Sequence, residues 1–333
     1  MRDVKINRIE TRAQLIGDIR IVLERSRRVV VITHIDPDGD AIGTQLAFGA
    51  YLRALGKDVV LVHDSEIPQK YMFLPEIDRL VKVDRVDGIP RFDTAVVLEC
   101  PNADRMGAAS RFLAPGTAII NIDHHPDSAV EGDVSWVDVT ASSVGEMAYE
   151  FFAESGFKIT HDVATQLYAA ILTDTGRFRF ESTTPRALVI AGELVAAGAD
   201  PRTICDRIYF DLEPATMLLT ARVLNSIEYF ADGQICVIVL SQAMLAETGA
   251  GEGSTEGLVD YTLYTKGVLV GVLLKEGDGK GTKVSLRSRG DFNVAAIASR
   301  LGGGGHFNAA GGRLPMDLAR AKNEIVRILK AEL

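Results

Sequence analysis

Short apolar runs alternate with helical segments through the first half of the chain, and this alternation restricts the fold more than any other feature. The β-branched run from Val29 to Thr33 is followed by a helical pattern from Ala41 to Leu55, which Gly56 closes as a C-cap. Further strand-like runs follow at 58 to 62, 94 to 98 and 117 to 122. Strands separated by helices predict βαβ units. We therefore expect an α/β first domain built on a parallel sheet.

The length of 333 residues exceeds what one hydrophobic core usually serves, so we expect two domains. The pattern turns helical from 143 to 207, and strand-like runs return at 235 to 240, 268 to 275 and 283 to 287. A smaller, mixed α/β second domain is the interpretation that fits them. We place the first domain at 1–192, a helical linker at 193–213 and the second domain at 214–333.

Charge and hydropathy exclude several classes of protein. A net charge of -9 argues against binding to long duplex nucleic acid, which depends on many contacts from Lys and Arg to phosphates. No apolar stretch reaches the roughly 18 residues needed to span a bilayer, and the first residues do not resemble a signal peptide. The widely spaced Cys100, Cys205 and Cys236 support neither a disulfide framework nor a thiolate zinc site. We expect a cytoplasmic protein without membrane partners.

An acidic loop follows the first strand-like run. Pro37 favours a turn and Gly39 allows it to be tight, so that His34, Asp38 and Asp40 can face one point. Carboxylates with one imidazole suit Mn²⁺ or Mg²⁺. The alternative is a solvated acidic turn with a helix N-cap at Asp40. An EF-hand is excluded because its glycine and its final glutamate would be misplaced.

Three other places carry candidate ligands. Glu99 closes the run 94 to 98, and Asp123-His124-His125 follow the run 117 to 122, so parallel strands would bring both to one sheet edge. One imidazole could bind metal and the other substrate, while Asp123 fixes a histidine tautomer. Asp174 ends a helical pattern, where an anion needs a nearby cation. The alternatives are surface acids and a polar loop containing one core histidine.

A glycine-rich segment marks the second domain. Glycines 302–305 precede His306, and backbone amides without side-chain cover can form an anion-binding nest. Between Gly281 and Arg313 the only acidic residue is Asp291, and the basic ones are Lys283, Arg287, Arg289, Arg300 and Arg313. A phosphate-binding second domain follows as a hypothesis. The alternative is a plain flexible loop, since the segment matches neither the P-loop nor G-x-G-x-x-G.

These residues together resemble the DHH phosphoesterase family, and within it the stand-alone NrnA-like type that degrades very short RNA and dephosphorylates 3′-phosphoadenosine 5′-phosphate (pAp). The resemblance spans nearly the whole chain and rests on five motifs in family order. They are THIDPDGDAIG from Thr33, VVLECPNADRMG from Val96, NIDHHPDS from Asn121, ILTDTGRFRF from Ile171 and SLRSRGDFNVAAIASRLGGGGHFNAAGG from Ser285.

The resemblance implies a role for each candidate residue. One Mn²⁺ would be held by His34 and Asp38, and a second by Asp40, His124 and Asp174. Glu99 would bridge the two ions, although the family usually has Asp at that position. The catalytic pair would be His125, which touches the scissile phosphate, and Asp123. The implied substrate-binding residues are Arg287, Ser288, Arg289, Gly303, Gly304, Gly305 and His306. Mg²⁺ stays an alternative, because the same ligands accept it.

The resemblance implies the function of a two-metal phosphoesterase with its active site in the cleft between the domains. Two ions would activate a water molecule for in-line attack on phosphorus. The substrates would be short single-stranded RNA, cut exonucleolytically to mononucleotides, and small phosphonucleotides such as pAp, converted to AMP. One alternative is a phosphodiesterase for the linear dinucleotide pApA, and another is a non-catalytic nucleotide-binding module. The sequence leaves a homodimer open.

Overall fold

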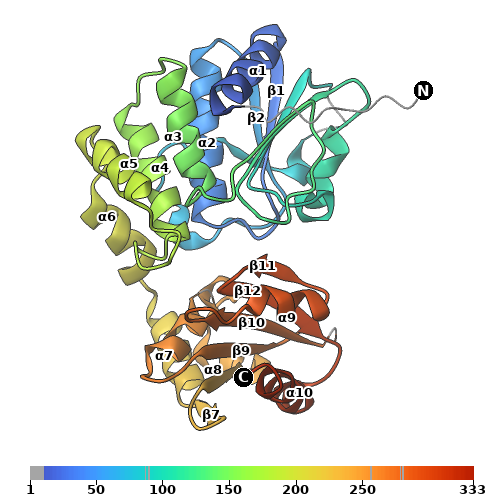
Figure 1. The fold of residues 1–333 in the computed structure, drawn as a ribbon, viewed down its shortest axis with the longest axis vertical. Helices are drawn as coiled ribbons and strands as arrows, with labels where there is room; N and C mark the ends of the chain where they lie inside the picture. Colours follow the sequence, from blue (N-terminus) through green and yellow to red (C-terminus); the bar gives the residue numbers. More distant parts are fainter. Residues whose placement is uncertain (1–10, 87, 89–90, 256, 278, 280) are drawn as a thin grey trace. The chain divides into compact units, whose positions relative to one another are not determined.

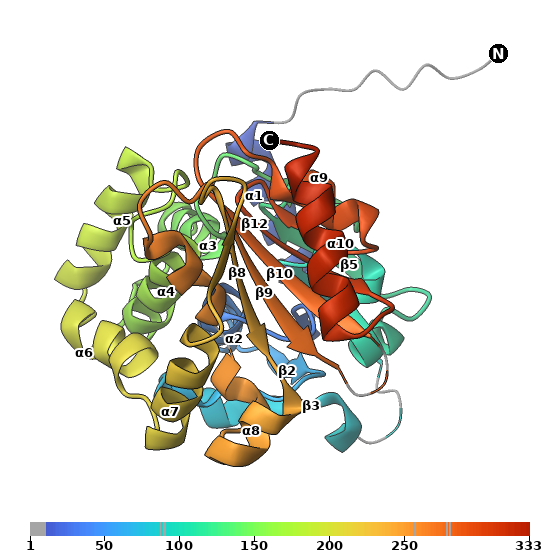
Figure 2. The ribbon, with the colours of Figure 1, turned by 90° about the horizontal axis from the view of Figure 1, so that it is seen from below.

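The computed structural model describes residues 11–86, 88, 91–255, 257–277, 279 and 281–333. The chain divides into two compact units, Met1–Asp211 and Leu212–Leu333 (Figures 1 and 2). Each unit has a six-stranded sheet of its own. None of the helices in these described ranges has the length and apolar character needed to cross a membrane.

The sheet of the first unit is parallel throughout, with the strand order β3-β2-β1-β4-β5-β6. Its strands are β1 (Arg28–Ile32), β2 (Asp58–His63), β3 (Leu80–Lys82), β4 (Thr94–Leu98), β5 (Ala118–Asp123) and β6 (Val134–Val137). The expected parallel α/β fold is confirmed, and the four strands expected from the sequence lie where they were predicted. The short edge strands β3 and β6 were not predicted, because neither has a long β-branched run.

Both faces of this sheet are covered. In β1, Val29 and Val31 join one core, while Val30 and Ile32 join another on the opposite face, as the alternation of side chains along a strand requires. The larger core contains residues of α1 (Arg12–Arg25), α2 (Gly39–Ala54), α3 (Val144–Glu154), α4 (His161–Asp174) and α5 (Pro185–Ala196). A 3₁₀ segment, Ala103–Phe112, contributes to the smaller one. Pro185 is the first residue of α5.

The unit continues beyond α5. Helix α6 (Pro201–Cys205) begins at Pro201 and runs into a π-helical turn, Asp206–Phe210. Leu194, Ile204 and Ile208 belong to the larger core of the first unit. The domain limits drawn from the sequence, with a linker at 193–213, stay a prediction. Shorter 3₁₀ turns lie at Gln69–Tyr71, Ile77–Arg79 and Val83–Arg85.

Helices α2 and α4 touch backbone to backbone, and a glycine makes this contact possible. A Cβ atom on Gly43 would lie 2.3 Å from the carbonyl oxygen of Gln166, and one on Gly39 would lie 2.4 Å from Oγ1 of Thr173. Helix α2 carries Asp40 in its first turn and α4 ends at Asp174. The glycine contact therefore sets the separation of two candidate metal ligands.

A Gly43→Ala variant should be destabilised by about 1–3 kcal/mol, because the added methyl group must push the two helices apart. Gly17→Ala in α1 is the matched control, since nothing lies within 4 Å of the position of its Cβ atom. Alanine is favoured over glycine in a helix by about 0.5–1 kcal/mol, so the control should be slightly stabilised. Urea unfolding of both variants measures the difference, and an unchanged Gly43→Ala midpoint would contradict the contact.

The second unit has a mixed sheet with the order β11-β12-β10-β9-β8-β7. Strands β8 and β9 are parallel and every other neighbouring pair is antiparallel. The strands are β7 (Glu228–Phe230), β8 (Ile235–Leu240), β9 (Val270–Glu276), β10 (Thr282–Ser288), β11 (Gly304–His306) and β12 (Ala309–Leu314). The expected mixed α/β architecture is confirmed, and β8 has its predicted bounds.

Helices cover this sheet on both faces. Helices α9 (Val294–Arg300) and α10 (Leu318–Lys330) pack on one face, while α7 (Pro214–Leu224) and α8 (Gln242–Thr248) pack on the other. Two 3₁₀ segments, Glu252–Thr255 and Leu258–Tyr264, complete the unit. The glycine-rich segment differs from its interpretation as a loop, because it forms the hairpin of β11 and β12. Glycines permit strand pairing here because the neighbouring backbones approach too closely for side chains.

Candidate metal centre

The predicted ligands of the first unit gather at the carboxyl ends of β1, β4 and β5. Strand β1 lies between β2 and β4, so the chain direction across the sheet reverses beside it. In open α/β sheets, ligands bind where the loops part at such a switch point. The acidic loop follows β1, Glu99 follows β4, and the two adjacent histidines follow β5. With Asp174 at the end of α4, four segments that are distant in sequence thus form one site.

The acidic loop is held by the helices that it contacts. Asp38 is the N-cap of α2, and its Oδ1 accepts hydrogen bonds from the backbone nitrogens of Asp40 and Ala41 at 3.0 and 3.1 Å. The sequence alternative that placed the N-cap at Asp40 is therefore wrong. The fully buried carboxylate of Asp40 instead accepts from the backbone nitrogens of Val144 and Gly145, at 2.6 and 2.8 Å. These amides begin α3, where the helix dipole favours an anion.

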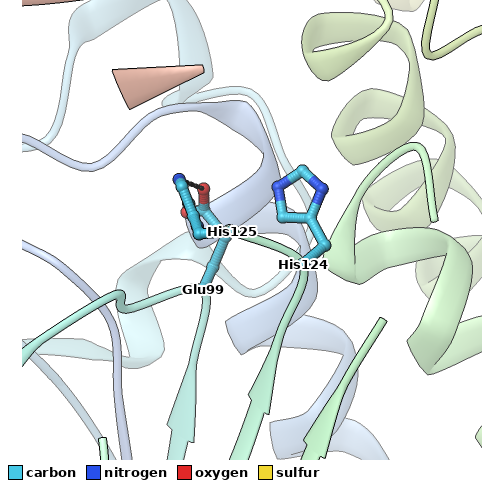
Figure 3. A group of neighbouring side chains, drawn as sticks. All are labelled: Glu99, His124 and His125. Carbon is cyan, nitrogen blue, oxygen red and sulfur yellow. Dashed lines mark ion pairs between the residues drawn. The ribbon is translucent and has the colours of Figure 1, made fainter. Parts of the chain in front are cut away.

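Glu99 lies at the centre of the site. Its side chain is 2 % exposed, and its backbone has a left-handed φ of 53° while its nitrogen donates to the carbonyl oxygen of Ile122 at 3.0 Å. Its Oε2 is 2.7 Å from Nε2 of His34, and its Oε1 is 3.9 Å from Nε2 of His125. Figure 3 shows the carboxyl group facing the ring of His125, with His124 beside it. Glu99 therefore connects the acidic loop with the two histidines.

Asp123 orients the histidine that follows it by two positions. Its Oδ1 accepts from the backbone nitrogens of His124 and His125, at 2.8 and 3.2 Å, and lies 2.8 Å from Nδ1 of His125. A carboxylate at this nitrogen holds the hydrogen on Nδ1 and leaves Nε2 to face the site. Asp123 itself is fully buried. Its geometry is that of a positioning residue, and a direct catalytic role for it stays a prediction.

His124 faces the end of α4. Its Nδ1 is 3.3 Å from the carbonyl oxygen of Ala141, which can only accept, so Nδ1 carries the hydrogen. Its Nε2 lies 3.5 Å from Oδ2 of Asp174. An imidazole nitrogen and a carboxylate oxygen at this distance can share one ion. His34 is arranged in the same way, since its Nδ1 lies 2.7 Å from the carbonyl oxygen of Ile35 and its Nε2 faces Glu99.

The described residues form three overlapping groups that could hold a metal ion. Within each group the potential ligand atoms lie within 4.8 Å of one another. The groups are His34, Asp38 and Glu99; Asp40, His124 and Asp174; and Glu99, His124 and His125. The structure therefore brings together all six predicted ligands. Glu99 joins the first and third groups, and its bridging role between two ions stays a prediction.

The donor set fits a divalent cation electrostatically. Burial raises the pKa of Glu99 well above its usual range, and the charges of Asp38, Asp40, Asp174 and Asp123 raise it further. Burial, followed by the charges of Asp40 and Asp38, also raises the pKa of Asp174 well above its usual range. Carboxylates that crowd one another in a dry site need a positive charge. A divalent ion supplies it with the oxygen and imidazole ligands that Mn²⁺ and Mg²⁺ accept.

Arg105 is a basic neighbour that the sequence did not single out. Its Nη2 lies 3.2 Å from Nδ1 of His34, and its carbonyl oxygen accepts from the backbone nitrogen of Ile35 at 2.7 Å. The only signal for it was its place in the motif that begins at Val96. Burial lowers the pKa of His34, and the charge of Arg105 adds to that effect although Asp38 opposes it. The neutral, metal-binding form of His34 is thereby favoured.

The predicted substrate-binding residues of the second unit form a group of their own. Arg287 in β10 pairs with Ala309 in β12, which in turn pairs with His306 in β11. Arg287 contacts Asp260 through its Nε at 3.0 Å, and Nη2 of Arg289 donates to the carbonyl oxygen of Leu263. These two arginines are thus already oriented by contacts within their own unit.

The rest of that group is built from hydroxyl and backbone atoms. Ser288 donates from Oγ to the carbonyl oxygen of Phe292 at 2.6 Å and accepts from Asn308 at 2.9 Å. Gly303 lies against the backbone of β12, where a Cβ atom would be 1.9 Å from the carbonyl oxygen of Gly311. Gly304 and Gly305 continue the hairpin in register with Gly311 and Ala310. No larger residue fits at Gly303 without moving β12.

Known proteins resemble the chain along most of its length. Residues 28–171 match the DHH family, N-terminal domain, and residues 232–333 match the DHHA1 domain. The bifunctional oligoribonuclease and PAP phosphatase NrnA of Thermus thermophilus is 34% identical over 92% of this chain and 90% of its own. The cyclic-di-AMP phosphodiesterase GdpP of Geobacillus thermodenitrificans is 27% identical over 92% of this chain, which spans 48% of that longer protein.

A solved structure shows the same fold in both units. The exopolyphosphatase-related protein from Bacteroides fragilis has a TM-score of 0.90 and 26% sequence identity, and the match covers 98% of each chain. The motifs, the parallel sheet with its cluster of carboxylates and histidines, and these matches agree with one another. The chain belongs to the DHH family of phosphoesterases, with a DHH domain followed by a DHHA1 domain.

Proposed function

We propose that this protein is a two-metal phosphoesterase that hydrolyses very short oligonucleotides to mononucleotides and removes the 3′-phosphate of pAp. One observation carries the proposal: the ligand groups around Glu99 and around Asp174 lie side by side at the switch point of the sheet. The 34% identity to the NrnA protein of Thermus thermophilus supports the choice of substrates. Two histidine ligands favour Mn²⁺ over Mg²⁺.

Each of the two ions would have its own set of ligands. His34, Asp38 and Glu99 would hold one ion, and Asp40, His124 and Asp174 the other. Two divalent ions bound there would supply an activated water and would offset the charge that develops on the phosphoryl group. His125 is held by Asp123 with its Nε2 towards Glu99, and it would contact the scissile phosphate from that side of the ring. Arg105 adds a positive charge beside His34.

The second unit would bind the rest of the substrate. Arg287, Ser288, Arg289 and the glycines 303–305 carry guanidinium groups, a hydroxyl group and backbone amides, and they lie in or beside strands β10 and β11, which flank β12. Such groups bind phosphates by charge-assisted hydrogen bonds. We assign the substrate's other phosphate or base to them and to His306.

The test is turnover of end-labelled RNA from dinucleotide to pentanucleotide, and of pAp, with Mn²⁺ or with a chelator. We expect mononucleotides from the RNA and inorganic phosphate from pAp, in both cases only with the metal. An RNA hairpin with a long duplex stem is the control substrate and should persist. If a metal-loaded preparation leaves both substrates intact, the proposed function is wrong.

A second candidate activity is cleavage of pApA, because the chain also resembles the cyclic-di-AMP phosphodiesterase GdpP over 92% of its length. The two activities use the same metal site and differ in the nucleotide that the second unit must accept. The ratio of kcat/KM for pApA to that for RNA dinucleotides of other sequence separates them. A strong preference for pApA favours the second candidate, while equal values favour the first. Tight binding of every nucleotide without turnover would indicate a binding module.

A further inference from the structure

Two residues of one metal-binding group are held by the same short segment, residues 141–145. The carbonyl oxygen of Ala141 lies 3.3 Å from Nδ1 of His124. Three residues later, the backbone nitrogens of Val144 and Gly145 donate to Asp40. The segment therefore fixes both an imidazole ring and a carboxylate, and any shift of it would move both.

A buried glutamate fastens this segment. Oε2 of Glu146, which is fully buried, accepts from the backbone nitrogen and the hydroxyl group of Ser142, at 3.1 and 2.5 Å. The sequence Ser143-Val144-Gly145-Glu146 fits a capping box, in which Glu146 would bond back to Ser143. Ser143 does cap α3, because it accepts from the nitrogen of Glu146 at 3.1 Å, but the carboxylate reaches Ser142 instead. Half of the predicted box is thus wrong, and its glutamate holds the preceding turn.

Arg186 from α5 contacts Glu146 and also Asp138, which lies just before the held segment. Nε of Arg186 lies 3.0 Å from Oε1 of Glu146, and its Nη1 lies 3.5 Å from Oδ2 of Asp138. Asp138 starts the turn, since its carbonyl oxygen accepts from the nitrogen of Ala141 at 3.1 Å. The guanidinium also donates from Nε to Glu150 at 2.6 Å. A carboxylate as deeply buried as Glu146 needs such a cation to offset its lost hydration.

We propose that Arg186 and Glu146 are positioning residues for the group of Asp40, His124 and Asp174. Arg186 neutralises Glu146, Glu146 holds Ser142, and the fixed segment orients His124 and Asp40 towards one ion. The inference rests on the proposed function, in which that group binds a metal. The described contacts of His34, Asp38 and Glu99 come from other parts of the chain. Loss of Arg186 should therefore weaken one of the two ions and spare the other.

The experiment is equilibrium dialysis of Mn²⁺ against the wild-type protein and Arg186→Met. The side chain of Arg186 is 31% exposed and lines a surface hollow of about 410 Å³, so methionine can be accommodated. Outer-shell partners of metal ligands typically change affinity by about 10–100-fold. We expect a loss of that size for one ion, unchanged affinity for the other, and recovery of kcat on pAp at high Mn²⁺ concentration.

Arg12→Met is the matched control. Arg12 belongs to the same cluster of charges, through Glu150 at 2.7 Å and Glu154 at 3.0 Å, and its contacts there do not include Glu146. It should bind both ions with wild-type affinity. Arg186→Lys, which keeps the charge, should recover part of the lost affinity. Unaltered binding of both ions by Arg186→Met would overturn the inference.

A second variant protects the test against misfolding. Ser142→Ala removes one hydroxyl group from the same chain of contacts and should also weaken a single ion. If Arg186→Met does not fold, Ser142→Ala decides the question by the same criterion. If the wild-type protein binds only one ion, both the proposed function and this inference are wrong. If the wild type binds two ions and the variants bind both with unchanged affinity, only this inference is wrong and the proposed function stands.

Discussion

An Asp174→Asn variant is expected to lose more than about 100-fold in kcat/KM on pAp and on RNA dinucleotides. Replacing outer-shell partners of a metal typically costs about 10–100-fold, and Asp174 belongs to a ligand group itself. Asparagine has nearly the same shape but lacks the charge that an ion requires. Initial rates at saturating Mn²⁺ measure the effect, together with the number of ions bound. A variant that binds two ions tightly and turns over at the full rate would show that Asp174 is not a metal ligand.

The same substitution should stabilise the metal-free protein. The raised pKa of Asp174 means that its ionised form is disfavoured in the folded state, so it costs stability at pH values above its unfolded pKa of about 3.9. Asn cannot ionise, so metal-free Asp174→Asn should unfold at a higher temperature than the metal-free wild type at pH 7. The difference should shrink as the pH falls towards 4. Asp162→Asn, an exposed change on the same helix, should affect neither turnover nor this difference.

Removal of the metal should abolish turnover completely and lower the unfolding temperature. The ligands come from four separate segments, so the unfolded chain has no assembled site and the ions bind the folded state alone. At an ion concentration 100-fold above Kd, each bound ion adds about 2.7 kcal/mol. For a unit of this size that corresponds to roughly 5–10 °C.

Thermal unfolding with Mn²⁺ and after dialysis against chelator, followed by return of Mn²⁺, measures both effects. Turnover that survives exhaustive chelation would contradict a metal-dependent mechanism. Asp174→Asn provides an internal control here. Because one of its ligand groups lacks a carboxylate, Mn²⁺ should raise its unfolding temperature by less than that of the wild type.

Local sequence patterns were enough to predict four strands of the main sheet and to expect several polar side chains at their carboxyl ends. The apolar runs that became β1, β4 and β5 are short, and parallel strands bring their ends to one edge. His34, Glu99 and His124 could therefore be placed together without any long-range information. The glycine after the first helical pattern also had its expected role, since Gly56 is left-handed at the end of α2.

Contacts between distant segments could not be predicted in the same way. The bond from Val144 to Asp40 joins residues 104 positions apart, and the contact of Gly43 with α4 depends on how two helices pack. Neither leaves a periodic signal in the sequence. The β11–β12 hairpin was missed for a related reason, because glycine runs favour loops by propensity and only tertiary pairing makes this one a strand.

Because the backbone of Glu99 is left-handed, the choice of carboxylate at this position also affects the free energy of folding. Residues other than glycine rarely adopt this conformation, and asparagine and aspartate tolerate it better than glutamate does. The chain thus retains a longer carboxylate where the backbone itself would prefer the shorter one. A series of Asp, Gln and Gly at this position would separate the reach of the side chain, its charge and the strain of the backbone. A stabilised but slower Glu99→Asp protein would show that selection for catalysis, and not for stability, maintains the glutamate.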